Sequence, residues 1–187
     1  MSFQKQKPDI LTTEVVARSQ LFCIEAQHLR FSNGVERHYE RMQPSQRHAV
    51  LLVPINDQNE LLLVREYCAG TEQYELGFPK GLIDPNETPD EAANRELKEE
   101  IGFGSRRLTP LKEVILAPSY FSSKMTLFLA QDLFVEQLEG DEPEPLDVVM
   151  WPLSEAQSLI AHPDFCESRS MTALFLALQT LALMEQN

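Results

Sequence analysis

Basic residues are scarce in this chain of 187 residues, which has 16 lysines and arginines against 29 acidic residues and a formal net charge of −13. Nucleic-acid backbones and anionic membranes are bound through basic patches, so this charge argues against both as partners. Long hydrophobic runs are also absent: the longest, 171–184, is interrupted by threonine and glutamine and is too short to span a bilayer. The first residues, MSFQKQKPDI, lack the apolar segment of a secretory signal.

The sequence has few cysteines as well. Cys23, Cys68 and Cys166 are far apart and match neither a zinc-site spacing nor a Cys-x-x-Cys pattern. We therefore expect a reduced, cytoplasmic setting. The length suits one compact domain with a small appendage, and the hydrophobic content of 43% is ordinary for a globular protein.

The segment with the most local signals is GLIDPNETPDEAANRELKEEIGF, which begins at Gly81. Thr88 has the chemistry of a capping residue, Pro89 stands at the first helical position, and Glu91 follows Thr88 by three residues. Together they form a capping box with proline at its preferred place. These signals predict a helix from Pro89 to Ile101, and the glycine that follows suits a left-handed residue at its end.

Three acidic side chains share one face of this predicted helix. At about 100° per residue, Glu96, Glu99 and Glu100 fall within roughly 100° of one another. They border an apolar stripe that should face a core and consists of Ala92, Ala93, Leu97 and Ile101. Like charges at these spacings repel, and more strongly where a core lowers the dielectric. One interpretation is a solvated acidic face; the other is a bound Mg²⁺ or Mn²⁺, since these hard ions prefer carboxylate oxygens.

The wider spacing favours the bound ion. The pattern is Gly81, five residues, Glu87, seven residues, Arg95-Glu96-Leu97, one residue, Glu99-Glu100, one residue and Gly102-Phe103. It resembles the Nudix box at every fixed position. The resemblance implies an α+β fold, an α/β/α sandwich with helices covering a mixed sheet, and the cleavage of a nucleoside diphosphate that is linked to a second group.

The resemblance also implies roles for single residues, with Mg²⁺ or Mn²⁺ as cofactor. The implied metal ligands are Glu96, Glu99, Glu100 and the backbone carbonyl of Lys80, which precedes the box glycine. Arg95 is expected to hold a carboxylate through its planar guanidinium, with Glu87 as its partner.

Further segments resemble the ADP-ribose pyrophosphatase branch of the family. They are YERM (39–42), ELGFPKGLIDP (75–85), APSYFSSKM (117–125) and EGDEPEPL (139–146). This implies hydrolysis of small ADP-containing substrates: ADP-ribose, NADH and diadenosine polyphosphates such as Ap3A. Two alternatives stay open. One is a Nudix hydrolase of a coenzyme A derivative or a damaged nucleotide, and the other is a non-catalytic sensor that binds ADP-ribose-like ligands.

The loop EGDEPEP has a possible catalytic role by the same resemblance. In relatives that cleave ADP-ribose, a carboxylate on the matching loop orients or deprotonates water, so Glu142 is the first candidate and Glu144 the second. Glu99 is a further catalytic candidate. A solvated acidic linker is the alternative for this loop. Adenine is expected to stack on an aromatic ring, with Tyr39 and Phe31 as candidates.

Because the chain has a negative net charge, the diphosphate of a substrate must bind to individual basic side chains. Arg41, Arg47 and Arg65 are candidates, because arginine binds phosphate in a bidentate way. Ser122 is a candidate substrate contact through its loop. Many relatives carry an arginine where this chain has Cys68, so Arg65 or Arg47 is expected to take over that contact.

Patterns elsewhere predict an N-terminal β region, 1–44, and a Nudix domain, 45–187. The start to about Thr13 is polar and is expected to be loosely held until it pairs with another segment. After it, strand-like runs flank Asn33-Gly34, a strong hairpin signal. The other predicted elements are strands at 47–55, 61–67, 112–117, 124–133 and 147–151, a helix opened by a capping box at Ser154 and Gln157, and a helix at 170–184. The hairpin has little core of its own, and relatives exchange such strands between subunits, so we expect a homodimer.

Overall fold

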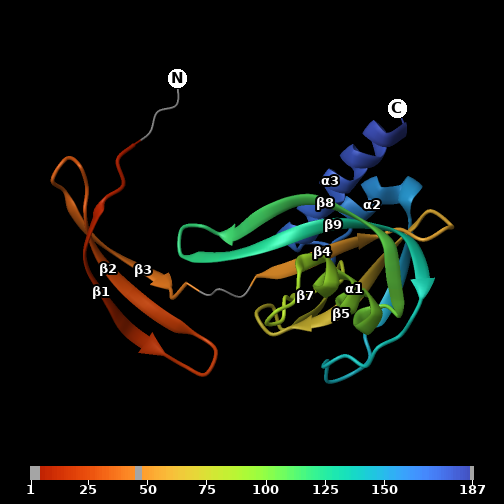
Figure 1. The fold of residues 1–187 in the computed structure, drawn as a ribbon, viewed down its shortest axis with the longest axis horizontal. Helices are drawn as coiled ribbons and strands as arrows, with labels where there is room; N and C mark the ends of the chain where they lie inside the picture. The colour runs from red at the N-terminus through yellow and green to blue at the C-terminus, as the bar shows by residue number, and fades with distance from the viewer. Residues whose placement is uncertain (1–4, 45–47, 186–187) are drawn as a thin grey trace. The chain divides into compact units, whose positions relative to one another are not determined.

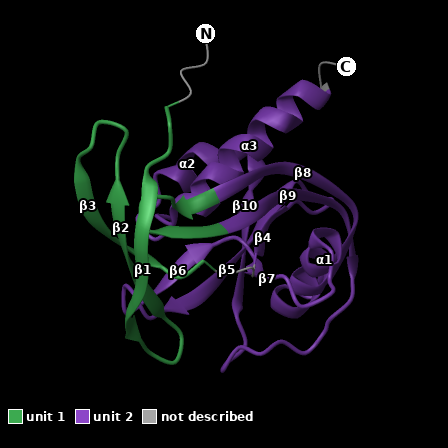
Figure 2. Ribbon diagram, turned by 60° about the vertical axis from the view of Figure 1, so that its left-hand side comes forward, with its two compact units in different colours: residues 1–46, 115–123 green, residues 47–114, 124–187 purple. Residues whose placement is uncertain are grey.

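The computed structural model describes residues 5–44 and 48–185. The chain divides into two compact units (Figure 2): unit 1 holds Met1–Gln46 and Ile115–Ser123, and unit 2 holds Arg47–Val114 and Lys124–Asn187. Unit 1 therefore combines the N-terminal segment with a short stretch from the middle of the chain. Arg47, one of the arginines predicted to contact the substrate, lies outside the described residues.

Unit 1 contains an antiparallel sheet of β1 (Asp9–Arg18), β2 (Cys23–Arg30) and β3 (Glu36–Met42), in that order (Figure 1). The predicted hairpin is present as β2 and β3, and Gly34 in its turn has a φ of +81°. The start of the chain, predicted to be loosely held until it pairs with another segment, pairs with β2 from Asp9 on, and Asp9 lies opposite Arg30. Register shifts after Ile10 and after Val15 interrupt the alternation of side chains along β1, and so the period-two pattern does not mark this strand.

Unit 1 has almost no apolar core of its own. Among its described residues, the buried ones are Glu25 and Gln27, which are both polar. Large apolar side chains are exposed on it and include Ile10, Val15, Val16, Leu21, Phe22, Val35 and Tyr39. A sheet of three strands with this surface needs a second surface to cover it.

Unit 2 contains two sheets, with the strand orders β10-β5-β6 and β7-β4-β9-β8. The strands are β4 (Ala49–Pro54), β5 (Glu60–Cys68), β6 (Gln73–Gly77), β7 (Lys80–Leu82), β8 (Phe103–Ala117), β9 (Phe121–Val135) and β10 (Asp147–Pro152). β4 and β9 run parallel, whereas β4–β7, β5–β6 and β5–β10 are antiparallel pairs. The mixed strand directions that were predicted are therefore confirmed.

Helices cover both faces of the strands of unit 2 (Figure 1). α1 (Pro89–Glu100) packs on one face, and α2 (Ala156–Ile160) and α3 (Ser168–Glu185) pack on the other, with the 3-10 turn η1 (Leu153–Glu155) before α2. In β4, Leu51 and Val53 join the apolar cluster of α2 and α3, while Val50 and Leu52 join that of α1. A strand buried on both faces needs a continuous apolar run. The predicted α/β/α sandwich is confirmed.

Some predicted elements of unit 2 need correction. β6 and β7 are not predicted as strands, and β8 begins at Phe103, well before the predicted start at 112. Pro110 interrupts the strand pattern in β8, but β8 is the outer strand of its sheet, where proline is tolerated. The capping box at Ser154 is wrong: Ser154 lies inside η1, and α2 starts at Ala156 after the cap residue Glu155, which makes no side-chain cap bond. A capping residue needs a non-helical backbone, which the 3-10 turn does not provide.

The C-terminal helix α3 is confirmed close to its predicted bounds. Its buried Leu174 belongs to the core, and Leu178 and Leu181 pack against that core. Of the helices in the part of the chain that the structure describes, none has the length and apolarity needed to cross a membrane.

Candidate active site

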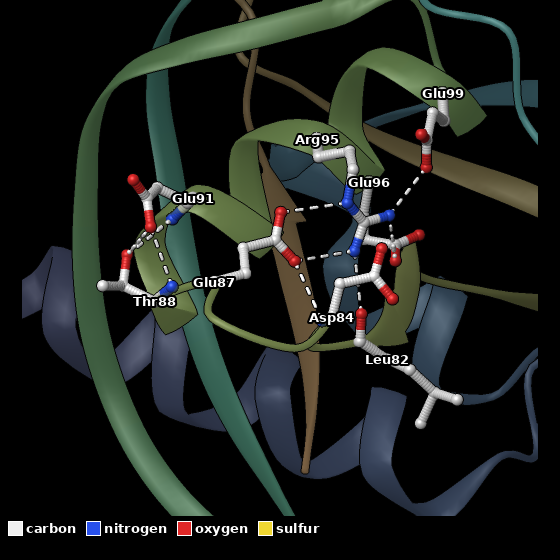
Figure 3. A network of polar contacts seen from close by, with 8 residues as sticks. All are labelled: Leu82, Asp84, Glu87, Thr88, Glu91, Arg95, Glu96 and Glu99. Carbon is white, nitrogen blue, oxygen red and sulfur yellow. Dashed lines mark hydrogen bonds and ion pairs between the residues drawn. The ribbon is translucent and has the colours of Figure 1, made fainter. Parts of the chain in front are cut away.

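The site starts with the turn that leads into α1 (Figure 3). The Thr88 hydroxyl accepts a hydrogen bond from the Glu91 N–H at 3.3 Å, and the Glu91 carboxylate accepts one from the Thr88 N–H at 2.8 Å. Pro89 takes the first helical position, and Gly102, with a φ of +74°, follows the end residue Ile101. The predicted capping box and helix end are confirmed, and together they set where α1 begins and stops.

Arg95 is the central cation of the site (Figure 3). Its Nε and Nη2 donate to the two oxygens of Glu87, each at 3.0 Å, and Nη2 also donates to the Leu82 carbonyl at 2.8 Å. Its Nη1 donates to Glu96 and Glu99, each at 2.8 Å. The hydrogen bonds from Arg95 lower the pKa of Glu87, which therefore stays ionised. One guanidinium thus joins the turn before α1 to two carboxylates of the helix.

Glu96 and Glu100 are buried acidic groups, only 7% and 8% exposed. Burial raises the pKa of Glu96 to about 7, with a further contribution from the charge of Glu99 and against the opposing effect of Arg95. Burial raises the pKa of Glu100 to about 9, with the charges of Glu96 and Glu66 adding to it. Such carboxyls favour the neutral form on their own, and a nearby divalent cation reverses that preference.

Strand β7 lies directly against these carboxylates. A Cβ atom at position 81 would occupy the space of the Glu96 carboxylate, so Gly81 leaves room for that carboxylate in its present position. The Lys80 N–H donates to Glu100 at 3.2 Å, and the Lys80 ammonium pairs with Glu66 of β5. Lys80 therefore lies beside the predicted ligands, while metal binding by its carbonyl stays a prediction.

The acidic loop after β9 is anchored to the end of α1. The Leu138 N–H donates to the Lys98 carbonyl at 3.1 Å. From this anchor the loop brings Glu142 to the wall of the cleft that holds the buried glutamates. The charge of Glu142 is one of the causes of the raised pKa of Glu96, so the two groups are electrostatically coupled.

Two adjoining clefts open in this part of unit 2. The acidic cleft has a volume of about 670 Å³ and is lined by Glu66, Lys80, Gly81, Leu82, Asp84, Arg95, Glu96, Glu99, Glu100 and 139–143. The aromatic cleft has a volume of about 370 Å³ and is lined by 65–67, Tyr74 and 142–147. Glu142 borders both clefts, whereas Glu144 lines the aromatic cleft and accepts a hydrogen bond from the Tyr74 hydroxyl. The structure therefore gives the two candidate bases different surroundings.

The donors of the acidic cleft suit a hard divalent cation. Carboxylate oxygens are the ligands that Mg²⁺ and Mn²⁺ prefer, and burial gives Glu96 and Glu100 a reason to accept a positive charge. Within residues 5–44 and 48–185, no three acidic, histidine or cysteine side chains are already gathered around one ion position. Glu96 and Glu99 are instead held by one nitrogen of Arg95, so an ion would compete with Arg95 for their oxygens.

The other predicted substrate contacts lie apart from these carboxylates in the hydrogen-bond network. Arg41 belongs to unit 1 and pairs with Glu25 at 3.1 Å. Ser122 is an exposed residue of β9 and also belongs to unit 1. Arg65 lines the aromatic cleft and pairs with Asp164 at 2.9 Å. Their roles in substrate binding stay predictions.

The lining residues that are not predicted as site residues from the sequence include Glu66, Tyr67 and Tyr74. Tyr67 and Tyr74 are opposite each other in the β5–β6 ladder, and their ring centroids are 5.6 Å apart in an edge-to-face arrangement. The sequence gives no signal for Glu66, because alternation along a strand would send it to the opposite face from the predicted Arg65, yet both line the aromatic cleft. The sequence also gives no signal for the two tyrosines, because only the pairing of β5 with β6 brings their rings into contact.

Two family models match the chain. The model of the NUDIX domain matches residues 45–172, and the model of the NudE-type Nudix hydrolase N-terminal domain matches residues 8–41. The first match covers unit 2 from its beginning into α3, and the second covers the strands of unit 1.

Individual relatives agree with these matches. The chain is 60% identical to the ADP compounds hydrolase NudE of Escherichia coli (strain K12), over 97% of both chains. It is 27% identical to an ADP-ribose pyrophosphatase of Bacillus subtilis (strain 168), over 67% of this chain and 69% of the relative. A crystal structure of an ADP compounds hydrolase matches with a TM-score of 0.94 and 59% identity over 98% of both chains. The chain therefore belongs to the Nudix hydrolase family.

Proposed function

We propose that this protein hydrolyses the diphosphate of ADP-containing compounds such as ADP-ribose, NADH and Ap3A. Water adds to one phosphorus, the bridging P–O bond breaks, and AMP leaves together with the phosphorylated second group. One observation carries the proposal: a single helix presents Glu96, Glu99 and Glu100 to a cleft of about 670 Å³, and two of these carboxylates are buried. The relatives named for ADP compounds and ADP-ribose support this substrate class.

Mg²⁺ or Mn²⁺ is the proposed cofactor. The residues proposed to hold it are Glu96, Glu99, Glu100 and, through its backbone carbonyl, Lys80. When bound, such an ion neutralises charge on the diphosphate and lowers the pKa of a bound water. Arg95 and Glu87 orient this set, because the guanidinium holds Glu96 and Glu99 on one side and is itself held by Glu87 on the other.

Glu142 is the proposed general base. It borders the acidic cleft and is coupled to Glu96, so it is well situated to take a proton from the attacking water. Glu144, the second candidate, is hydrogen-bonded to Tyr74. Glu99, the third, accepts a hydrogen bond from Arg95. These bonds make both less available than Glu142 as proton acceptors.

Side-chain cations complete the proposed diphosphate site. Arg65 donates to Asp164 through Nη1, and its other nitrogens are proposed to meet phosphate. Arg41, Arg47 and Ser122 are the remaining candidates for substrate contact. Where many relatives carry an arginine, this chain has Cys68, and Arg65 or Arg47 is proposed to take over that contact.

We also propose that the protein is a cytoplasmic homodimer. The exposed apolar side chains of unit 1 support association with a second copy, since that sheet has no apolar core to cover them. Cys23, Cys68 and Cys166 are free thiols, which suits a reducing compartment.

The test measures phosphate release, coupled to a phosphatase, from ADP-ribose, NADH, Ap3A, FAD and coenzyme A in the presence of Mg²⁺ or Mn²⁺. We expect kcat/KM for at least one of the first three to exceed the values for FAD and coenzyme A by about tenfold or more. A preference for coenzyme A would favour another Nudix substrate class. Binding of ADP-ribose without turnover would favour a sensor.

A further inference from the structure

We infer that the aromatic cleft binds a base of the substrate, stacked against Tyr67 and Tyr74, an inference that rests on the proposed function. The aromatic cleft adjoins the acidic cleft and shares Glu66, Glu142 and Pro143 with it. Its volume of about 370 Å³ lies within the range of small-molecule pockets. A diphosphate in the acidic cleft therefore has a cavity of suitable size directly beside it for the nucleoside.

The two tyrosines form a platform with open ring surface. Tyr67 and Tyr74 are 52% and 54% exposed although they contact each other, with ring planes at 63°. Both rings line the cleft. Exposed rings of this kind can stack a base, because every base offers a flat π face.

A hydrogen bond holds one ring of the platform in place. The Tyr74 hydroxyl donates to Glu144, and this bond raises the pKa of Tyr74. Tyr74 is joined to its neighbour strand through the pair with Tyr67. A ring fixed both by its ladder position and by its hydroxyl loses little further freedom when a base stacks on it.

The charges of the aromatic cleft favour a base over a phosphate. Glu144 and Asp147 are carboxylates of its lining, and the carboxylates outnumber the one lining cation, Arg65, whose Nη1 is paired with Asp164. Carboxylates repel phosphate but accept hydrogen bonds from amino groups such as that of adenine. Pro143, Pro145 and Leu146 add apolar surface to the same cleft.

Both the adenine of ADP and the dihydronicotinamide of NADH offer what this platform recognises, a flat heterocycle joined through ribose to a diphosphate. The substitutions Tyr67→Ala and Tyr74→Ala test the inference, with kinetics on ADP-ribose and NADH. We expect KM to rise about 5- to 100-fold, as removal of one base–aromatic stack predicts, while kcat changes little. Tyr74→Phe keeps the ring but loses the bond to Glu144, so its KM should lie between those of the original protein and Tyr74→Ala.

Phe175→Ala is the matched control, because Phe175 is an aromatic side chain of α3 that is 53% exposed. Tyr39→Ala tests the alternative stacking residue from the sequence. A higher KM for both substrates in the two alanine variants assigns the cleft to adenine, and a higher KM for NADH alone assigns it to the second base. An unchanged KM for both substrates, with an unchanged melting temperature, overturns the inference, as does an effect confined to Tyr39→Ala.

Quenching of tyrosine fluorescence by AMP and by nicotinamide mononucleotide gives a readout that does not depend on turnover. We expect at least one of them to bind with a Kd that rises in both alanine variants. If the unmodified protein hydrolyses neither substrate, the proposed function fails, yet this titration still decides whether the tyrosines bind a base. Equal Kd values for the unmodified protein and the alanine variants would count against the platform.

Discussion

Glutamates on α1 occupy contrasting environments within three turns of helix. Glu91 is exposed, and its hydrogen bonds from Thr88 lower its pKa. Glu96 and Glu100 are buried, and their pKa values are raised to about 7 and about 9. Charge that serves only solubility lies on exposed side chains. The burial of Glu96 and Glu100 therefore distinguishes these two proposed ligands from the exposed capping residue Glu91.

Replacing one buried carboxylate tests the metal site. Glu96→Gln or Glu100→Gln is expected to lower kcat by at least about 100-fold, because each removes a proposed ligand while keeping the side-chain shape. Turnover of ADP-ribose with Mg²⁺ is the measurement, and circular dichroism checks that the fold is retained. Glu91→Gln is the matched control on the same helix. Near-normal turnover in both ligand variants would refute the assignment.

The two candidate bases are distinguished by a second pair of substitutions. Glu142→Gln is expected to lower kcat by about 100-fold or more, as loss of a general base does. Glu144→Gln should change kcat much less, because Glu144 is bound to Tyr74 in the aromatic cleft. Kinetics across pH with saturating metal measure both effects. The opposite order of effects would make Glu144 the base.

At the scale of the element, α1 depends on its N-terminal cap. Thr88→Ala removes the side-chain half of the capping box, and we expect the free energy of unfolding to fall by about 1 kcal/mol. Thr88→Ser keeps the hydroxyl and should restore most of this stability. Urea unfolding of the three proteins makes the comparison. Equal midpoints for threonine and alanine would show that packing alone sets the start of the helix.

The buried carboxyls of α1 also predict how stability depends on pH. Their pKa values of about 7 and about 9 lie above the ordinary value of 4.5, so the folded protein binds more protons than the unfolded chain between these limits. The free energy of unfolding without metal should therefore fall as pH rises from about 5 to 9, by at most about 1.4 kcal/mol per pH unit for each group.

Thermal unfolding with a chelator, at several pH values, measures this dependence, and Glu100→Gln should flatten it. Added Mg²⁺ or Mn²⁺ should raise Tm more at high pH than at low pH, because protons and the cation compete for the same oxygens. A metal-induced increase in Tm that is the same at every pH would contradict this linkage.

On the scale of the whole molecule, unit 1 is the part through which we propose that the homodimer forms. Its buried Glu25 accepts hydrogen bonds from Arg41 and Gln43, so polar contacts occupy its interior while its apolar side chains are exposed. The substitution Val15→Glu places a charge among those apolar side chains. We expect it to convert a dimer into monomers at micromolar concentration, since burying an unpaired charge is costly.

Light scattering after size-exclusion chromatography measures the mass of the original protein and of the variant. Glu14→Gln, at the neighbouring position of β1, is the matched control and should leave the mass unchanged. A monomeric mass for the original protein would contradict the proposed homodimer.

Signals that act over a few residues were enough to predict much of this protein. The cap at Thr88, the glycine after Ile101 and the apolar run of β4 are local, and the structure confirms α1, β4 and the α/β/α arrangement. Local signals succeed because capping and side-chain periodicity depend on neighbours along the chain. They failed at β1 and β8, where register shifts or a proline interrupt the pattern.

The sequence by itself determined that three glutamates share one face of a capped helix within a Nudix box. Tertiary structure alone decided which of them are buried, that Lys80 pairs with Glu66, and that Tyr67 and Tyr74 form one wall of a second cleft. These contacts join residues from different strands and loops. Their formation depends on strand register and on packing between layers, which no short segment of sequence contains.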